Sequence, residues 1–164
     1  MVTYLLSFNN MFLIIAGHPA TGKTTLSEKL KAVYPDHTLL HTDDYMEYGY
    51  KESVYKLIED LESYEFQNII VEGIMGARLM RKLQEVHKEA TVDLYVYFSA
   101  KFDHIIDVYT RERPDKKLKD IEATIKGLDT VHNSIDLSTQ AHLNINISDF
   151  AEHDKLPDIL KSHL

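Results

Sequence analysis

Residues 17–24 read GHPATGKT and have the composition of a phosphate-binding loop. They fit the pattern G-x-x-x-x-G-K-[ST], with an apolar run before them and a segment of helical character after them. Glycine lets the backbone curl so that successive N–H groups point at phosphate oxygens, and the following helix adds its positive N-terminus. In this pattern the lysine, here Lys23, contacts the β- and γ-phosphates, and the hydroxyl of the next residue, here Thr24, binds Mg²⁺. We therefore predict an ATP and Mg²⁺ site at Gly17, His18, Pro19, Ala20, Thr21, Gly22, Lys23, Thr24 and Thr25.

Two adjacent aspartates, Asp43 and Asp44, follow the second apolar run in the segment HTDDY. In an open parallel sheet the ligand crevice lies beyond the carboxyl ends of the strands, so this pair should face the phosphate loop. A carboxylate there can accept a proton from an attacking hydroxyl or help to hold Mg²⁺. We predict Asp43 as catalytic base and metal ligand, and Asp44 and Tyr45 as acceptor-binding. The alternatives are that one aspartate only caps a helix, and that Tyr45 packs the helix expected over residues 51–65.

A third carboxylate stands at the end of the third apolar run, in the sequence IIVEG. Glu72 is expected to order Mg²⁺ or bind an acceptor hydroxyl, because a buried glutamate without such a task would be costly. Gly73 allows a tight turn or the close approach of a substrate. Both residues are therefore predicted at the acceptor side of the same crevice.

A short basic stretch, residues 111–119, stands out in an acidic chain. Arg111 and Arg113 precede Pro114, which breaks the helix expected before it. Negative charge builds up on the equatorial oxygens during phosphoryl transfer, so arginines that close over the phosphates would stabilise the transition state. We predict a helical lid over about 111–119 with Arg111 and Arg113 as catalytic cations. The alternative is a solvated positive patch, which is our interpretation of Lys116, Lys117 and Lys119.

Short apolar runs alternate with segments of helical period along the whole chain, which is typical of an α/β protein with a parallel sheet. Strands are expected over residues 11–16, 38–42, 68–72, 92–98 and 143–147. Helices are expected behind the phosphate loop and over residues 51–65, 77–89, 102–109, 115–137 and 154–163. The sequence therefore predicts an α/β, three-layer P-loop NTPase fold with a five-stranded parallel sheet, as one domain over residues 1–164.

Composition narrows the classes of function. The 164 residues hold 18 Lys and Arg against 26 Asp and Glu, a net charge of −8, which disfavours a generic nucleic-acid binder. The chain has no cysteine, which fits a reducing compartment, and it has no apolar stretch of the length that a membrane helix needs. These features favour a cytoplasmic protein without a membrane partner.

The segments GHPATGKTT, HTDDY and VEG, with VDLYVYF followed by an arginine-bearing helix, resemble the small P-loop kinases typified by uridine kinase and nicotinamide riboside kinase. The resemblance covers nearly the whole chain in order, and its P-loop is the specific part. It implies phosphoryl transfer to a hydroxyl of a small, nucleoside-like acceptor, with Asp43 as the base and the arginines in the lid. Many kinases of this class carry glycine where this chain has Ala20, so a positive φ there would strain the loop mildly.

Three alternatives to a small-molecule kinase stay open from the sequence. The P-loop with a strand-end Asp-Asp-Tyr also looks like polynucleotide 5′-hydroxyl kinases and zeta-type toxins. A nucleic-acid kinase would use the basic stretch to hold the strand, and its activity would fall steeply with salt. A P-loop switch or ATPase would hydrolyse ATP without any acceptor and would tolerate Asp43→Asn.

Overall fold

The computed structural model describes residues 11–49 and 51–147. Its centre is a five-stranded parallel sheet with the strand order β2-β3-β1-β4-β5. The predicted α/β architecture is confirmed, and the predicted strand bounds agree with the observed ones to within two residues. The strands are β1 (Phe12–Gly17), β2 (Thr38–His41), β3 (Ile69–Glu72), β4 (Leu94–Ser99) and β5 (His142–Asn146).

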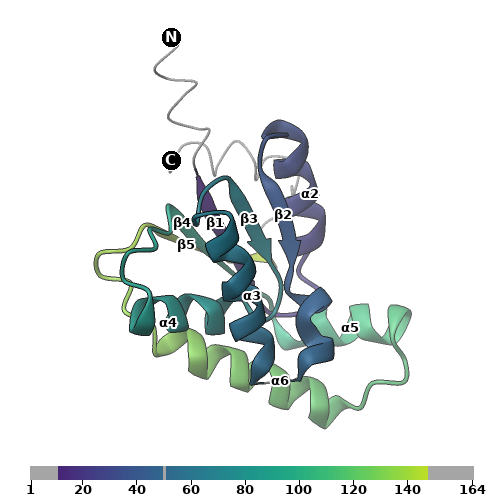
Figure 1. Ribbon diagram of the computed structural model, residues 1–164. Helices are drawn as coiled ribbons and strands as arrows, with labels where there is room; N and C mark the ends of the chain where they lie inside the picture. Colours follow the sequence, from purple (N-terminus) through teal and green to yellow (C-terminus); the bar gives the residue numbers. More distant parts are fainter. Residues whose placement is uncertain (1–10, 50, 148–164) are drawn as a thin grey trace.

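Helices cover both faces of this sheet (Figure 1). Side chains alternate along β1, so that Leu13 and Ile15 face one way and Phe12 and Ile14 face the other. Helix α2 (Lys23–Val33) covers the first face, and α3 and α4 cover the second, which gives the three layers that the sequence predicts. The remaining elements are η1 (Thr42–Tyr48, a 3-10 helix), α3 (Glu52–Ser63), α4 (Gly76–Val86), α5 (Phe102–Glu112) and α6 (Leu118–Asn133).

Helix α6 differs from its prediction in length and in burial. It runs over Leu118–Asn133 and not over 115–137, and its apolar stripe is only partly covered. Ile121 is buried, whereas Leu118 is 56% exposed. The stripe is incompletely buried because this helix reaches past the edge of the sheet and lines the hollow described below. The helix predicted over 154–163 and the first ten residues lie outside the described residues.

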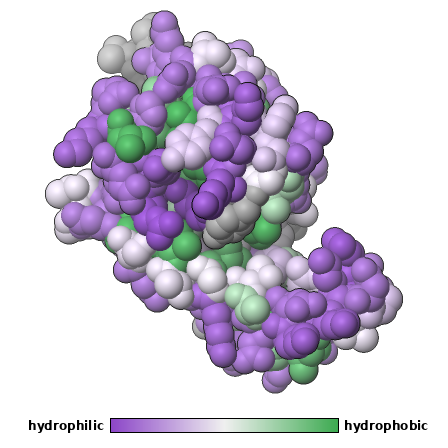
Figure 2. All heavy atoms as spheres, turned by 60° about the horizontal axis from the view of Figure 1, so that its bottom comes forward, coloured by the Kyte–Doolittle hydropathy of each residue, from purple (hydrophilic) through white to green (hydrophobic). Residues whose placement is uncertain are grey.

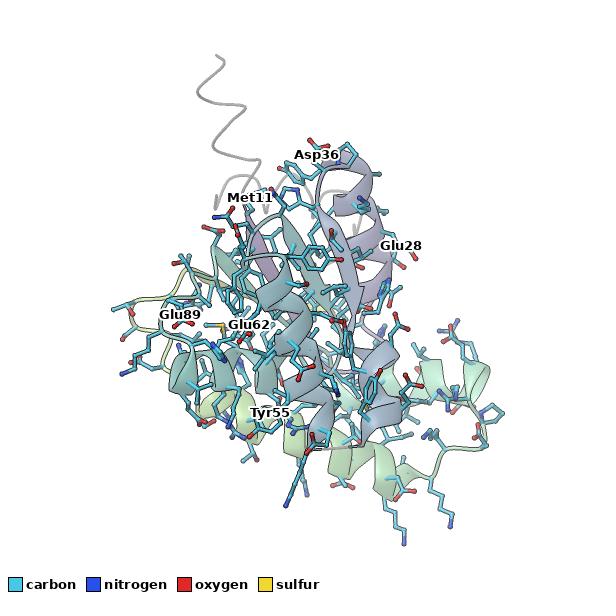
Figure 3. The ribbon with its side chains drawn as sticks, in the orientation of Figure 1. Met11, Glu28, Asp36, Tyr55, Glu62 and Glu89 are labelled. Carbon is cyan, nitrogen blue, oxygen red and sulfur yellow. The ribbon has the colours of Figure 1, made fainter. Side chains whose placement is uncertain are left out.

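The parallel sheet brings three strand ends together at one edge. The phosphate loop follows β1, η1 follows β2, and Glu72 ends β3. Met11 and Asp36 mark the opposite edge of the sheet in Figure 3. Of the helices in the described ranges, none has both the length and the apolar character needed to span a bilayer.

Candidate active site

The loop after β1 adopts left-handed backbone conformations that its glycines permit. Gly22 caps α2 with φ 85°. Gly17 has φ 126°, and a Cβ there would lie 2.1 Å from the carbonyl oxygen of Phe98, so this position requires glycine. Ala20 has φ 61°, which is the mild strain anticipated from the sequence. The Thr21 hydroxyl donates to the carbonyl oxygen of His18 at 2.7 Å and closes the turn.

Lys23 is buried at the start of α2, with 6% of its surface exposed. Its Nζ donates a hydrogen bond to the carbonyl oxygen of His18 in the same loop. Burial lowers the pKa of Lys23 to about 8, although the negative charges of Glu72 and Asp43 act in the opposite direction. The ammonium is therefore desolvated and close to both carboxylates, in a state that an anionic phosphate would stabilise further.

Glu72 links the ends of two strands to the phosphate loop. Its Oε1 accepts a hydrogen bond from the Thr24 hydroxyl at 3.3 Å and lies 2.6 Å from Nδ1 of His41. His41 pairs with Glu72 in the parallel register of β2 and β3, which is why the two side chains meet. The carboxylate is 5% exposed, so the burial predicted for this strand end is observed. His41 was missed from the sequence, because the order of β2 and β3 was needed to find it.

These groups line one cleft of about 380 Å³ at the carboxyl edge of the sheet. Residues 19–24 form its floor, while Asp43, Glu72 and Gly73 form one wall. Sequence reasoning thus placed the loop, the η1 carboxylate and the β3 carboxylate correctly in one crevice. The facing wall comes from α5, α6 and the turn between them, through Tyr109, Arg113, Lys116 and Thr124.

Arg113 and Lys116 lie in the turn that joins α5 to α6, on a projecting arm of the molecule (Figure 1). Figure 2 shows this arm as mostly hydrophilic, with a hollow between it and the main body. Tyr109 lines the same wall; burial raises its pKa, Arg113 lowers it and Asp43 raises it. Asp43 and Arg113 line the same cleft. Lys116 is exposed, as interpreted from the sequence, and it also lines the cleft wall.

Of the site residues predicted beyond the loop at 17–25, three do not line this cleft. Arg111 is exposed two residues before Arg113, at the end of α5, where its Nε donates to the carbonyl oxygen of Asp107 at 3.4 Å. Asp44 is exposed on η1. Tyr45 is buried in the core, and its hydroxyl donates to Asp60 of α3, so the packing interpretation describes it. Successive side chains of a helical turn point in different directions. Asp43 therefore lines the cleft, whereas Asp44 and Tyr45 do not.

Gly17, His18 and Thr25 of the predicted loop also do not line the cleft, whereas Gly73 does. Gly73 has φ 141°, and a Cβ there would lie 1.9 Å from Oγ1 of Thr42, so its close approach is to this chain's own η1. His18 turns its side chain toward Asp129 of α6. Gly17 packs against β4. Thr25 is exposed in the first turn of α2.

The oxygens at this edge fit a hard divalent cation. Thr24 Oγ1 and Glu72 Oε1 are adjacent, and Asp43 shares the cleft with them. Oxygen ligands are those that Mg²⁺ prefers, and Mg²⁺ commonly fills its remaining positions with water and substrate phosphates. Within residues 11–49 and 51–147, no three His, Asp or Glu side chains converge on a common metal position. Thr24, Asp43 and Glu72 are the oxygen donors that this edge offers to such a cation.

Comparison with known proteins identifies the fold. The sequence matches no protein-family profile and no curated protein. Shikimate kinase from Acinetobacter baumannii in complex with shikimate superimposes with a TM-score of 0.64 at 16% identity, over 96% of this chain and 94% of that one. This chain therefore shares the fold of that structure, a parallel α/β sheet covered by helices.

Two further solved structures have the same architecture. The tunicamycin resistance protein of Deinococcus radiodurans has a TM-score of 0.63 at 14% identity, over 93% of this chain and 94% of that one. Thymidylate kinase from Candida albicans has a TM-score of 0.59 at 12% identity, over 93% of this chain and 90% of that one. At such identities the similarity establishes the fold and leaves the reaction to be argued from the site.

Proposed function

We propose that this chain is an ATP-dependent kinase that transfers the γ-phosphoryl group of ATP to a hydroxyl of a small, nucleoside-like acceptor. The observation that carries the proposal is the convergence of Asp43, Lys23 and Glu72 in one cleft above the phosphate loop. A carboxylate beside the γ-phosphate position is what a hydroxyl acceptor requires. Solved structures named as shikimate kinase and thymidylate kinase share the fold and support this class of reaction.

In this proposal residues 19–24 hold the triphosphate, and Lys23 neutralises its β- and γ-phosphates. Asp43 accepts the proton of the acceptor hydroxyl as the hydroxyl oxygen attacks the γ-phosphorus. The new oxygen–phosphorus bond forms, the bond from that phosphorus to the β–γ bridging oxygen breaks, and ADP leaves with the bonding electrons. Arg113 and Lys116 stabilise the charge on the transferring oxygens from a lid at about 111–119 of a single domain spanning residues 1–164.

Thr24, Asp43 and Glu72 are the residues proposed to hold Mg²⁺, directly or through water. When bound, Mg²⁺ neutralises phosphate charge and aligns the triphosphate for in-line attack. His41 holds the Glu72 carboxylate at 2.6 Å and thereby fixes the direction in which its oxygens point.

The test is ADP release from Mg·ATP in the presence of nucleosides, nucleoside analogues, sugars or 5′-hydroxyl oligonucleotides. We expect a small hydroxyl compound to stimulate turnover by the wild type, and Asp43→Asn to lower that turnover by about 10²-fold or more. Asp44→Asn is the matched control, since it removes a neighbouring charge on η1 outside the cleft. Stimulation by oligonucleotides alone would indicate a nucleic-acid kinase. Equal, acceptor-independent hydrolysis by wild type and Asp43→Asn would refute the proposal.

A further inference from the structure

We call the cleft of about 380 Å³ described above the phosphate cleft. A second hollow of about 400 Å³, which we call the side pocket, opens beside it. Ile74 and Thr124 line both hollows, so the two adjoin at these residues. Figure 2 shows hydrophobic side chains in the hollow between the main body and the arm. The apolar lining of the side pocket includes Met46, Ile74, Met75, Ala77, Leu128 and Val131.

The position and chemistry of the side pocket suit the body of a small acceptor. Its volume is in the range of small-molecule sites, and such sites combine an apolar lining with a few placed polar groups. Here the polar groups are at two ends: Thr124 at the phosphate cleft, and Arg78 at the far side. An acceptor whose hydroxyl reaches Asp43 would pass Thr124 and place the rest of its structure against apolar side chains. Apolar side chains offer no hydrogen-bond partners to the polar edge of a base or a sugar, so such a lining does not select for one.

Gly127 gives independent support for a ligand in this space. It lies in the interior of α6, where glycine is less favourable than alanine. Among the described residues, and apart from its chain neighbours and the backbone of α6 around it, no atom lies within 4 Å of the position that a Cβ at Gly127 would take; its φ is not in the positive range. Neither packing nor backbone conformation therefore requires glycine here. What the glycine does is leave the wall of the side pocket open.

The far end of the side pocket is positively charged. Half-buried Arg78 lines the side pocket and also an adjoining surface cleft between α3 and α4. That cleft gathers Lys51, Arg81 and Lys82 against a single acid, Glu85. Tyr55 points from α3 toward α4 in Figure 3, and Lys82 Nζ lies 5.1 Å from its ring centroid. In a chain of net charge −8, this local excess of cations favours an anion at the Arg78 end.

We infer that the side pocket binds an apolar ring of the acceptor, and that this acceptor carries a carboxylate or phosphate group beside Arg78. The inference rests on the proposed function, because it takes the acceptor hydroxyl to be at the Thr124 end. It defines the acceptor as an alcohol with three parts: the reacting hydroxyl at the phosphate cleft, a weakly polar ring, and an anionic substituent. An unmodified nucleoside supplies the first part and lacks the third.

The binding test uses two fluorescent probes of similar shape that need no phosphoryl transfer. Anilinonaphthalene sulfonate has an apolar ring system and an anion, whereas phenylnaphthylamine lacks the anion. We expect Gly127→Leu to weaken both probes about tenfold or more by filling the side pocket, and Gly127→Ala to keep binding close to wild type. We expect Arg78→Met to weaken the sulfonate about tenfold and to leave the neutral probe unchanged. Lys126→Met is the control for loss of a surface charge on α6.

Competition by benzoate and by phenyl phosphate then distinguishes a carboxylate from a phosphate as the anion. The pocket assignment would be overturned if Gly127→Leu bound both probes as tightly as the wild type does, with normal circular dichroism and normal ATP binding. Equal weakening of both probes by Arg78→Met would overturn the anionic part.

Measurements of turnover distinguish a failure of this inference from a failure of the proposed function. A ring-bearing alcohol with a carboxylate or phosphate should stimulate ADP release, and Gly127→Leu should raise its KM about tenfold with the Kd for ATP unchanged. Stimulation only by uncharged acceptors, with KM insensitive to Gly127→Leu, would overturn the inference and leave the kinase proposal intact. Variant-sensitive probe binding without stimulation by any acceptor would instead overturn the kinase proposal.

Discussion

Asp129 on α6 holds the second residue of the phosphate loop: its Oδ1 lies 2.7 Å from Nε2 of His18. The backbone N–H of Ala100 donates to Nδ1 of the same ring at 3.2 Å, so neutral His18 carries its proton on Nε2 and donates it to Asp129. The Tyr97 hydroxyl of β4 donates to the same carboxylate oxygen at 2.8 Å. The helix that follows the proposed lid is thus joined directly to the loop proposed to hold the nucleotide.

We expect Asp129→Ala to destabilise the fold by about 1–3 kcal/mol, because it leaves the polar groups of buried His18 and Tyr97 without their acceptor. The Kd for ATP should rise severalfold, since the loop backbone loses a support. Asp129→Asn keeps an acceptor oxygen and should have a smaller effect. Urea denaturation and titration with a fluorescent ATP analogue measure the two quantities. Glu122→Ala, on the exposed side of α6, is the control, and equal behaviour of Asp129→Ala and Glu122→Ala would contradict the coupling.

Lys23 should destabilise the unliganded protein. Its folded pKa of about 8 is below the ordinary 10.5, so unfolding takes up a proton between these two values. The penalty is therefore fully present below pH 8 and is relieved as the pH rises toward 10.5. We expect Lys23→Met to be more stable than the wild type by up to about 3 kcal/mol at pH 7, with the difference shrinking above pH 8. ATP binding should be lost in this variant.

Thermal denaturation of the wild type and Lys23→Met across pH 6 to 10 measures the difference directly. In the wild type, affinity for Mg·ATP should fall as the pH rises above about 8, because binding then requires proton uptake by Lys23. A stability difference that stays constant with pH would show that burial of this ammonium is not its cause.

The backbone of Ala20 predicts a substitution that stabilises the protein. At φ 61° an alanine pays the left-handed penalty of about 1–2 kcal/mol that glycine avoids. Ala20→Gly also makes the unfolded chain more flexible, so we expect a net gain of about 0.5–1 kcal/mol. Ala32→Gly on the exposed face of helix α2 should instead cost about 1 kcal/mol. Opposite signs in urea denaturation would confirm the backbone argument, and a loss in both variants would contradict it.

The local sequence was sufficient where one segment determines its own structure. The strands, the phosphate loop and the strain at Ala20 follow from apolar runs and glycine positions within a few residues. Asp43 and Glu72 were placed correctly because parallel strands end at a common edge, whatever their order.

Contacts between distant segments could not be found in the same way. His41 meets Glu72 across 31 positions, and His18 meets Asp129 across 111. Finding either pair requires the strand order or the docking of α6. The side pocket is formed by η1, the segment after β3 and α6, none of which has a recognisable ligand motif. Within η1 the short helical turn decided which of two adjacent aspartates faces the cleft.

The two arginines of the basic stretch should differ sharply in catalysis, because only Arg113 lines the phosphate cleft with Lys116. A cation positioned at the transferring phosphoryl group contributes several kcal/mol to transition-state stabilisation. We expect Arg113→Ala to lower kcat by about 10²-fold and Lys116→Ala by about tenfold, with little change in stability since both side chains are exposed. Arg111→Ala removes an equal charge two residues away and should stay within about twofold of the wild type. Steady-state ADP release with saturating acceptor measures all three variants. Comparable losses from Arg111→Ala and Arg113→Ala would show that the net charge of the lid, and not the placement of Arg113, supports the reaction.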